Sequence, residues 1–204
     1  MILALDTATR VACVALIGGD GATLAEILDP EVASATRRVL QMIDDVLSSQ
    51  SAGTNDLTRI VVGRGPGSFT GLRVALATAE ALGDALDVPV TGVSTLAALR
   101  AKAPPGAAAV IDARRGEVFV EAAGIAPRAM SPSALGALCP VVCVGDGAIR
   151  YRAILEGAGA IVAADDDPVH VVSGAALVRA SRSGGGPPRP LYLREPDAVP
   201  SAAR

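Results

Sequence analysis

The strongest constraint on the fold is the order of the apolar segments in the first half of the chain. Three short apolar runs come first, separated by tight polar turns, and an amphipathic segment follows them at residues 36–47. The three runs cover residues 2–5, 11–17 and 22–28. Short buried segments at 60–63 and 90–93 then flank the helical stretch 72–86. This β-β-β-α-β-α-β order predicts an α/β lobe with a mixed sheet flanked by helices.

A second lobe is predicted where small residues and prolines interrupt this pattern, at residues 102–106. The segments beyond it predict strands at 109–113, 118–122 and 141–144, helices at 148–156 and 173–181, and a docked extended tail at 191–197. The chain has 204 residues, enough for two lobes that each bury a core. We therefore expect the lobes to be 1–103 and 104–204.

The composition is that of a globular protein, because 50% of the residues are hydrophobic and 19% are charged. No apolar run approaches the ~20 residues that cross a bilayer. The N-terminus has no basic region before its apolar stretch, so no signal peptide is expected. These features predict a cytoplasmic protein without membrane contacts, in which Cys13, Cys139 and Cys143 are small buried residues.

The charge balance argues against a protein that binds nucleic acid by itself. The net charge is −3, and the basic pairs Arg37-Arg38 and Arg114-Arg115 are scattered among acids. Proteins that hold nucleic acid alone usually carry a basic excess, because phosphate contacts supply most of the affinity. Four aromatic residues in the whole chain offer little base stacking.

The glycine-rich segment 63–73 lies between a predicted strand and a predicted helix. Glycines there let the backbone approach a partner closely, and helix N-terminal amides can hold an anion. The segment matches neither the Walker pattern, nor GxGxxG, nor GxSxG. Two interpretations stay open, a nucleotide site and, favoured here, a rigid turn that serves an interface. The candidate nucleotide-proximal residues are Asp6, Gly65, Gly67, Ser68 and Thr70.

The helix predicted at 72–86 is apolar nearly all round, with only Arg73, Glu80 and Asp84 forming a polar strip. Such a helix needs two partners. One is the sheet of its own lobe. The second is either the 36–47 helix or a matching surface on another polypeptide.

The sequence lacks the residue patterns that several kinds of metal and catalytic site require. His170 is the single histidine, so no HxxxH or HExxH metal pair exists. We expect His170 at the surface, the acidic run 165–167 in a solvated loop, no metal site and no catalytic residue.

Several segments together resemble one known family from end to end. The most specific are GPGSFTGLR at 65–73 and DARRGEV at 112–118, and the others lie at 5–7, 92–96, 145–148 and 190–194. In these segments the chain resembles the TsaB (YeaZ) family, non-catalytic partners in the bacterial threonylcarbamoyl-adenosine modification of tRNA. One departure is the sequence at 31–34, where the family often has a histidine before the first helix. The role of that histidine is not carried over.

The resemblance implies a two-lobed actin-like, ribonuclease-H-like (ASKHA) fold and a scaffold role. Its implied partners are a TsaD-like transferase and a TsaE-like ATPase, with a homodimer when the chain is alone and tRNA contacted only through the complex. No cofactor is expected on the isolated chain, and ATP or ADP with magnesium would belong to the assembled complex. The resemblance places partner contacts on the two first-lobe helices, with candidate residues Val39, Ile43, Leu47, Leu72, Leu76, Ala79 and Gly83.

Two enzyme alternatives remain. The first is an ATP-using phosphotransferase of the actin and sugar-kinase class, with Asp6 orienting a metal-bound water and the 65–71 loop at the nucleotide. A turn or cap role for Asp6 competes with it. The second is the glycopeptidase activity once attributed to this superfamily, for which the sequence offers neither a metal site nor a complete nucleophile set.

Overall fold

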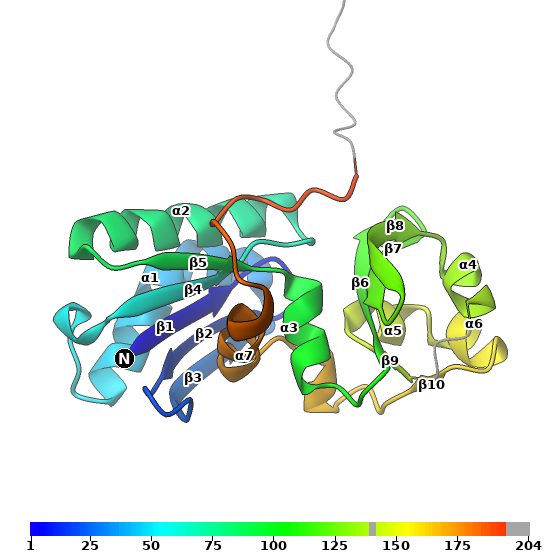
Figure 1. Cartoon of the computed structure of the whole chain (residues 1–204), viewed down its shortest axis with the longest axis horizontal. Coiled ribbons are helices and arrows are strands. Elements are labelled where there is room, and N and C mark those ends of the chain that lie inside the picture. Colours follow the sequence, from blue (N-terminus) through cyan, green and yellow to red (C-terminus); the bar gives the residue numbers. More distant parts are fainter. Residues whose placement is uncertain (139–141, 195–204) are drawn as a thin grey trace, which may run out of the picture.

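The chain forms two lobes side by side, each built on a five-stranded sheet (Figure 1). The structure is a computed structural model that describes residues 1–138 and 142–194, with only the backbone described for residues 32–36. Both sheets are mixed and flanked by helices, as the sequence predicts.

The first sheet has the strand order β3-β2-β1-β4-β5. Its antiparallel half joins β1 to β2 and β2 to β3, and its parallel half joins β1 to β4 and β4 to β5. The central strands are buried on both faces, which explains their continuous apolar sequence. The strands are β1 (Ile2–Asp6), β2 (Ala12–Ile17), β3 (Thr23–Asp29), β4 (Arg59–Gly63) and β5 (Val90–Val93).

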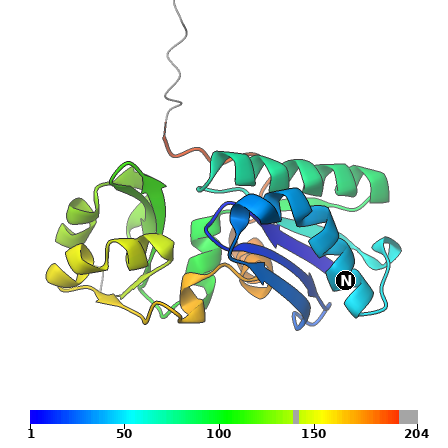
Figure 2. The ribbon, with the colours of Figure 1, turned by 180° about the vertical axis from the view of Figure 1, so that it is seen from behind.

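Two long helices cover one face of this sheet, α1 (Val32–Ser49) and α2 (Phe69–Leu86) (Figure 2). The opposite face is covered by α7 (Gly174–Gly184). Between the lobes lies α3 (Thr95–Lys102), which contacts α7 on one side and the second sheet on the other. A short 3₁₀ turn, η1 (Thr54–Asp56), precedes β4.

The second sheet repeats the topology of the first, with the order β8-β7-β6-β9-β10 when its strands are read from the antiparallel edge. Here β6–β7 and β7–β8 are antiparallel, whereas β6–β9 and β9–β10 are parallel. The elements of this lobe are β6 (Ala108–Arg114), β7 (Glu117–Ala122), β8 (Ile125–Met130), α4 (Pro132–Ala137), β9 (Val142–Val144), α5 (Asp146–Arg150), α6 (Arg152–Gly157), β10 (Ile161–Val162) and η2 (Pro168–His170).

Three local predictions for the second lobe need correction. The helix expected at 148–156 is two short helices, because Tyr151 leaves helical geometry between α5 and α6. The strand β8 was not predicted from the sequence, and its Pro127 is tolerated because β8 is an edge strand. Nor were α4 and β10 predicted. The predicted docked tail is confirmed for 191–194, while residues 195–197 and Cys139 lie outside the described residues.

The last helix returns to the first lobe. Residues 104–204 were expected to form one lobe, yet α7 packs across β1, β2, β4 and β5 of the first sheet. Its buried Leu177 and Val178 belong to the same apolar cluster as Ala4 and Val61. By its packing, α7 therefore extends the first lobe. Among the described residues, no helix is both long enough and apolar enough to span a membrane.

The seven residues expected to contact a partner lie in the core of this chain instead. Leu72 and Leu76 are 1% and 4% exposed, and Val39, Ile43, Leu47, Ala79 and Gly83 are buried as well. Six of them, all but Gly83, belong to one apolar cluster under α1 and α2, and Gly83 lies against Val90 of β5. These side chains are therefore occupied by folding.

We expect Leu76→Ala to lower the free energy of unfolding by about 2–5 kcal/mol, because it leaves a cavity between α2 and the sheet. The matched control is Leu40→Ala, since Leu40 lies on α1 but is 63% exposed, and its change should stay within about 0.5 kcal/mol. Urea denaturation followed by circular dichroism measures both. Equal losses in the two variants would contradict the division between core and surface.

Candidate functional site

The glycine-rich loop before α2 packs against the turn between β1 and β2. Ser68 N donates to Ala8 O at 2.7 Å, and Thr7 Oγ1 donates to Gly71 O at 2.6 Å. A Cβ atom at Gly67 would lie 2.2 Å from Ala8 O, and one at Gly71 would lie 1.8 Å from Thr7 O. The close approach that these glycines allow is therefore used by the chain's own backbone, which favours the rigid-turn interpretation over a phosphate cradle.

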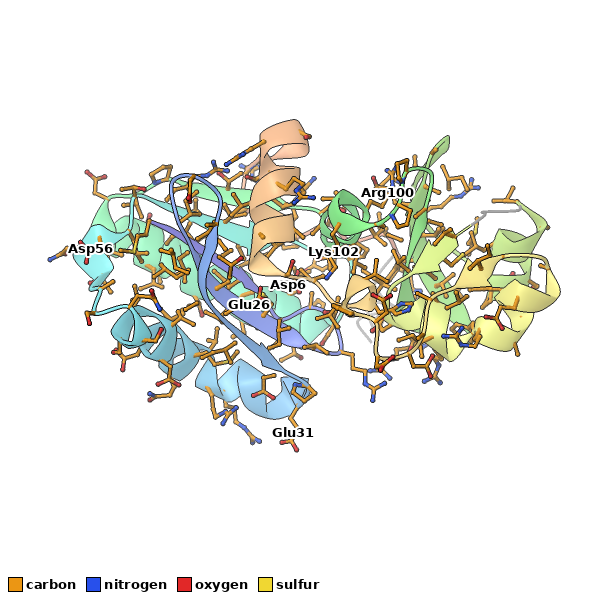
Figure 3. All side chains as sticks on the ribbon, turned by 90° about the horizontal axis from the view of Figure 1, so that it is seen from below. Asp6, Glu26, Glu31, Asp56, Arg100 and Lys102 are labelled. Atoms are coloured by element: carbon orange, nitrogen blue, oxygen red, sulfur yellow. The ribbon has the colours of Figure 1, made fainter. Side chains whose placement is uncertain are left out.

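Asp6 is fully buried at the end of β1 (Figure 3). Its Oδ1 accepts from Ala8 N at 2.8 Å, and its Oδ2 accepts from the hydroxyl of Thr95 at 2.9 Å. Burial raises the pKa of this carboxyl, and the hydrogen bonds from Ala8 and Thr95 counteract that rise in part. In this arrangement Asp6 joins β1 to the start of α3, which corresponds to the turn role considered for it.

A cleft of about 410 Å³ lies between the lobes. One wall comes from the β1–β2 turn and the first turn of α2, and the other from the β6–β7 hairpin and the start of α5. The polar residues that line it are Thr9, Arg10, Ser68, Thr70, Asp112, Arg114, Asp146 and Arg194. These residues come from distant parts of the sequence, and five of them are charged.

Two carboxylates organise the charges of the cleft. Asp146 accepts a hydrogen bond from the backbone amide of Asp112 at 3.1 Å. Burial raises the pKa of Asp146, the nearby carboxylate of Asp112 raises it further, and the nearby backbone amide of Arg10, which belongs to the other lobe, lowers it. Asp112 in turn faces the guanidinium groups of Arg114 at 3.7 Å and Arg150 at 3.6 Å. Asp146 thus faces Arg10 of the other lobe across the cleft, and Asp112 lies close to two arginines of its own lobe.

The candidate residues for a nucleotide separate into two groups. Gly67, Ser68 and Thr70 line the cleft, whereas Gly65 and Asp6 are buried away from it. The sequence analysis missed Arg10, Asp112 and Asp146 as cleft residues. A signal was available, because Asp112 follows an apolar strand as Asp6 does, and the two strands occupy equivalent places in the two sheets.

The prediction that His170 lies at the surface is wrong. The residue is 5% exposed, and its Nδ1 accepts from Gly145 N at 3.0 Å. The Nδ1 atom also lies 3.2 Å from Gly145 O, and Nε2 lies 3.3 Å from Ala163 O. His170 therefore holds η2 against the start of α5 as a buried core residue.

The acidic run at 165–167 is partly used in structural contacts. Asp165 pairs with Arg152 at 2.5 Å, and Asp167 caps η2 through Val169 N at 2.8 Å. Within 1–138 and 142–194, no group of histidine, cysteine and acidic side chains is arranged to hold a metal. Cys13 and Cys143 are buried, as predicted.

The outer face of α1 and α2 is the second candidate surface. On α1 it exposes Leu40, Gln41 and Asp44, and on α2 it exposes Arg73, Ala77 and Glu80. Leu40 is 63% exposed although it is a large apolar residue. We call these six residues the outer helical face.

Comparisons with known proteins show which proteins this chain resembles in sequence and structure. A family model described as TsaD, tRNA N6-adenosine threonylcarbamoyltransferase, matches residues 28–126. The TsaB protein of Escherichia coli, named for tRNA threonylcarbamoyladenosine biosynthesis, is 40% identical over 124 residues, 58% of this chain and 52% of that protein. An uncharacterized protein of Mycobacterium tuberculosis is 32% identical over 204 residues, 98% of this chain and 95% of that one.

The similarity also extends to a solved structure, YeaZ from Pseudomonas aeruginosa. It superposes with a TM-score of 0.75 at 26% identity, covering 94% of this chain and 99% of that one. The match spans about half the length of the TsaB relatives of E. coli and Haemophilus influenzae. By its duplicated mixed sheets and interlobe cleft, this chain is a two-lobed actin-like (ASKHA) protein. Within that class it belongs to the TsaB (YeaZ) family.

The buried carboxyl of Asp6 predicts a pH effect on stability. Because the folded chain raises the pKa of Asp6 above its ordinary value of 3.8, ionising Asp6 costs folding free energy as the pH rises through that raised pKa. In Asp6→Asn, the amide can accept from Ala8 N and donate to Thr95, without the charge. We expect the variant to lose less stability than the wild type between pH 4.5 and 7.5.

Urea denaturation at the two pH values measures this difference. Asp44→Asn, which removes an exposed carboxylate on α1, is the control and should follow the wild type. Parallel pH profiles for the wild type and Asp6→Asn would contradict the account of Asp6.

Proposed function

We propose that this chain is a non-catalytic subunit in the biosynthesis of threonylcarbamoyladenosine in tRNA. The observation that carries the proposal is membership of a family whose named relatives are biosynthesis proteins of this modification. The geometry supports a role without catalysis, because the glycine-rich loop packs against the backbone of the β1–β2 turn and Asp6 is buried. The chain binds no cofactor of its own in this proposal, and ATP or ADP with magnesium belongs to the assembled complex.

The partner in this proposal is a TsaD-like transferase, which the chain meets through its outer helical face. The TsaD family model matches residues 28–126, a range that contains α1, α2, β4 and β5 but neither β1 nor β2. The shared helices support pseudo-symmetric pairing, in which equivalent helices of two related chains pack together. The same face serves a homodimer when the chain is alone, and a TsaE-like ATPase completes the assembly.

The phosphotransferase alternative has less support. It needs a carboxylate that reaches a metal-bound water and a loop that is open to phosphate. Asp6 instead points into the core toward Thr95, and Gly67 and Gly71 touch the β1–β2 turn. The cleft residues Asp112 and Asp146 are engaged with backbone amides and arginines. The glycopeptidase alternative lacks a metal cluster among the described residues.

The interface prediction is tested with a charge on the outer helical face. Leu40→Glu should leave the chain folded, since Leu40 is 63% exposed, but should lower co-purification with the TsaD-like partner at least about tenfold. Ile161→Glu is the matched control, because Ile161 is 59% exposed and lies in the second lobe. Full co-elution of folded Leu40→Glu with the transferase would place the interface elsewhere.

A second expectation concerns tRNA. With a net charge of −3, the isolated chain should bind tRNA only in the non-specific range of roughly 10⁻⁴ to 10⁻⁶ M near physiological salt. Fluorescence anisotropy with the lone chain measures this affinity. Tight saturable binding that is lost when both Arg114 and Arg115 are changed to Ala would make this subunit itself a tRNA receptor.

A further inference from the structure

The last described segment of the chain, residues 185–194, runs as an extended strap from the first lobe to the second (Figure 1). We call it the C-terminal strap. It begins beside the free edge of β5, where Gly186 and Gly92 exchange backbone hydrogen bonds of 3.0 and 2.8 Å. Further along, Leu191 N donates to Arg64 O at 2.7 Å. Backbone bonds thus anchor the strap to the first lobe.

The middle of the strap is held by aromatic contacts at the first turn of α2. The Tyr192 ring stacks on Phe69 with 5.9 Å between ring centroids, and Arg73 covers Phe69 at 3.9 Å. Arg73 Nε also donates to the Tyr192 hydroxyl at 3.3 Å. Two of the chain's four aromatic residues are used in this contact. Phe69 is exposed although large and apolar, and the strap gives it a partner.

The end of the strap reaches the second lobe through Arg194. Its Nη1 donates to Ala113 O at 3.1 Å, and its Nη2 pairs with Glu117. The guanidinium lies 5.8 Å from the centroid of the Phe119 ring. All three partners belong to the β6–β7 hairpin, and Arg194 itself lines the interlobe cleft. A single extended segment therefore contacts both walls of the cleft, the α2 side through Tyr192 and the β6–β7 side through Arg194.

The strap crosses between the lobes on the side opposite the two other chain crossings, so its contacts can hold the lobes together. The two other chain crossings between the lobes, after α3 and before α7, lie together on one side of the junction (Figures 1 and 2). The strap passes on the opposite side. Two adjacent crossings form a hinge, so the opposite side is where the lobes would separate. There Arg10 of the first lobe and Asp146 of the second line the cleft together.

We propose that the C-terminal strap is a clasp that holds the interlobe cleft closed, with Tyr192 fastened to α2 and Arg194 to the β6–β7 hairpin. Releasing either end lets the lobes open about the crossings beside α3. This inference does not depend on the proposed function, because it concerns contacts within one chain. In this proposal, the strap controls how far the cleft opens to any molecule that binds there.

Hydrogen exchange measured by mass spectrometry tests the clasp on the full-length protein. The reporter is the Arg10 amide, because Arg10 lines the cleft from the first lobe. It lies close enough to Asp146 of the second lobe for its amide to lower the pKa of that carboxyl, which burial raises. Tyr192→Ala and Arg194→Ala should each speed exchange at Arg10 by roughly two- to tenfold, the factor that corresponds to losing one aromatic contact. Arg189→Ala is the matched control, because Arg189 is an exposed arginine of the same strap, and it should leave exchange unchanged.

The amides of β2 provide the internal reference, since this strand lies in the core of the first sheet. Faster exchange at Arg10 with unchanged exchange in β2 supports the clasp. Unchanged exchange at Arg10 in the double variant Tyr192→Ala/Arg194→Ala would overturn it. Equal acceleration at Arg10 and in β2 would also overturn it, because the strap would then only add general stability.

Discussion

The contact between the glycine-rich loop and the β1–β2 turn is the constraint on which the rest of this structure depends. Backbone meets backbone there, with Ser68 N on Ala8 O and Thr7 Oγ1 on Gly71 O. No side chain larger than hydrogen fits at Gly67 or Gly71 without displacing the turn. This contact fixes where α2 begins, and so it positions one wall of the cleft, the exposed Phe69 and the outer helical face.

The two lobes share a topology but use equivalent positions differently. Each first strand ends near an aspartate, Asp6 in β1 and Asp112 in β6. Asp6 is sealed in the core against Thr95, whereas Asp112 faces the cleft and its arginines. The carboxylate that an actin-like enzyme would need at its first turn is thus withdrawn from solvent, and the charges of the cleft are supplied mostly by the second lobe and the strap.

Apolar side chains of a surface helix can either pack in the core of their own chain or stay exposed. In α1 and α2 nearly all large apolar side chains face the sheet, and Leu40 and Phe69 are the large ones left strongly exposed on these two helices. Phe69 is paired with Tyr192 inside the chain. Leu40 is therefore the large apolar side chain of the outer helical face, and the polar residues around it keep this face compatible with water.

The sequence by itself determined the first lobe, because periodicity is a local property. The five strands up to residue 93 and the helices α1 and α2 follow from apolar spacing, although both helices begin earlier than predicted, at Val32 and at Phe69. The motifs at 65–73 and 112–118 also sufficed to place the chain in its family. Only the tertiary structure decided which residues are reachable, since a helix that is apolar nearly all round does not reveal which side its sheet covers.

The same limit explains the remaining errors. His170 was misplaced because its burial depends on a contact with Gly145, which is distant in sequence. The sequence left two roles open for Asp6 because its burial depends on a contact with Thr95, which is also distant in sequence. The duplication of the sheet was hidden because topology, unlike a short repeat, leaves no fixed period in the sequence. The return of α7 to the first sheet and the grip of Arg194 on the β6–β7 hairpin are likewise long-range contacts. Local patterns specify elements, and only packing between distant segments decides which surfaces remain for function.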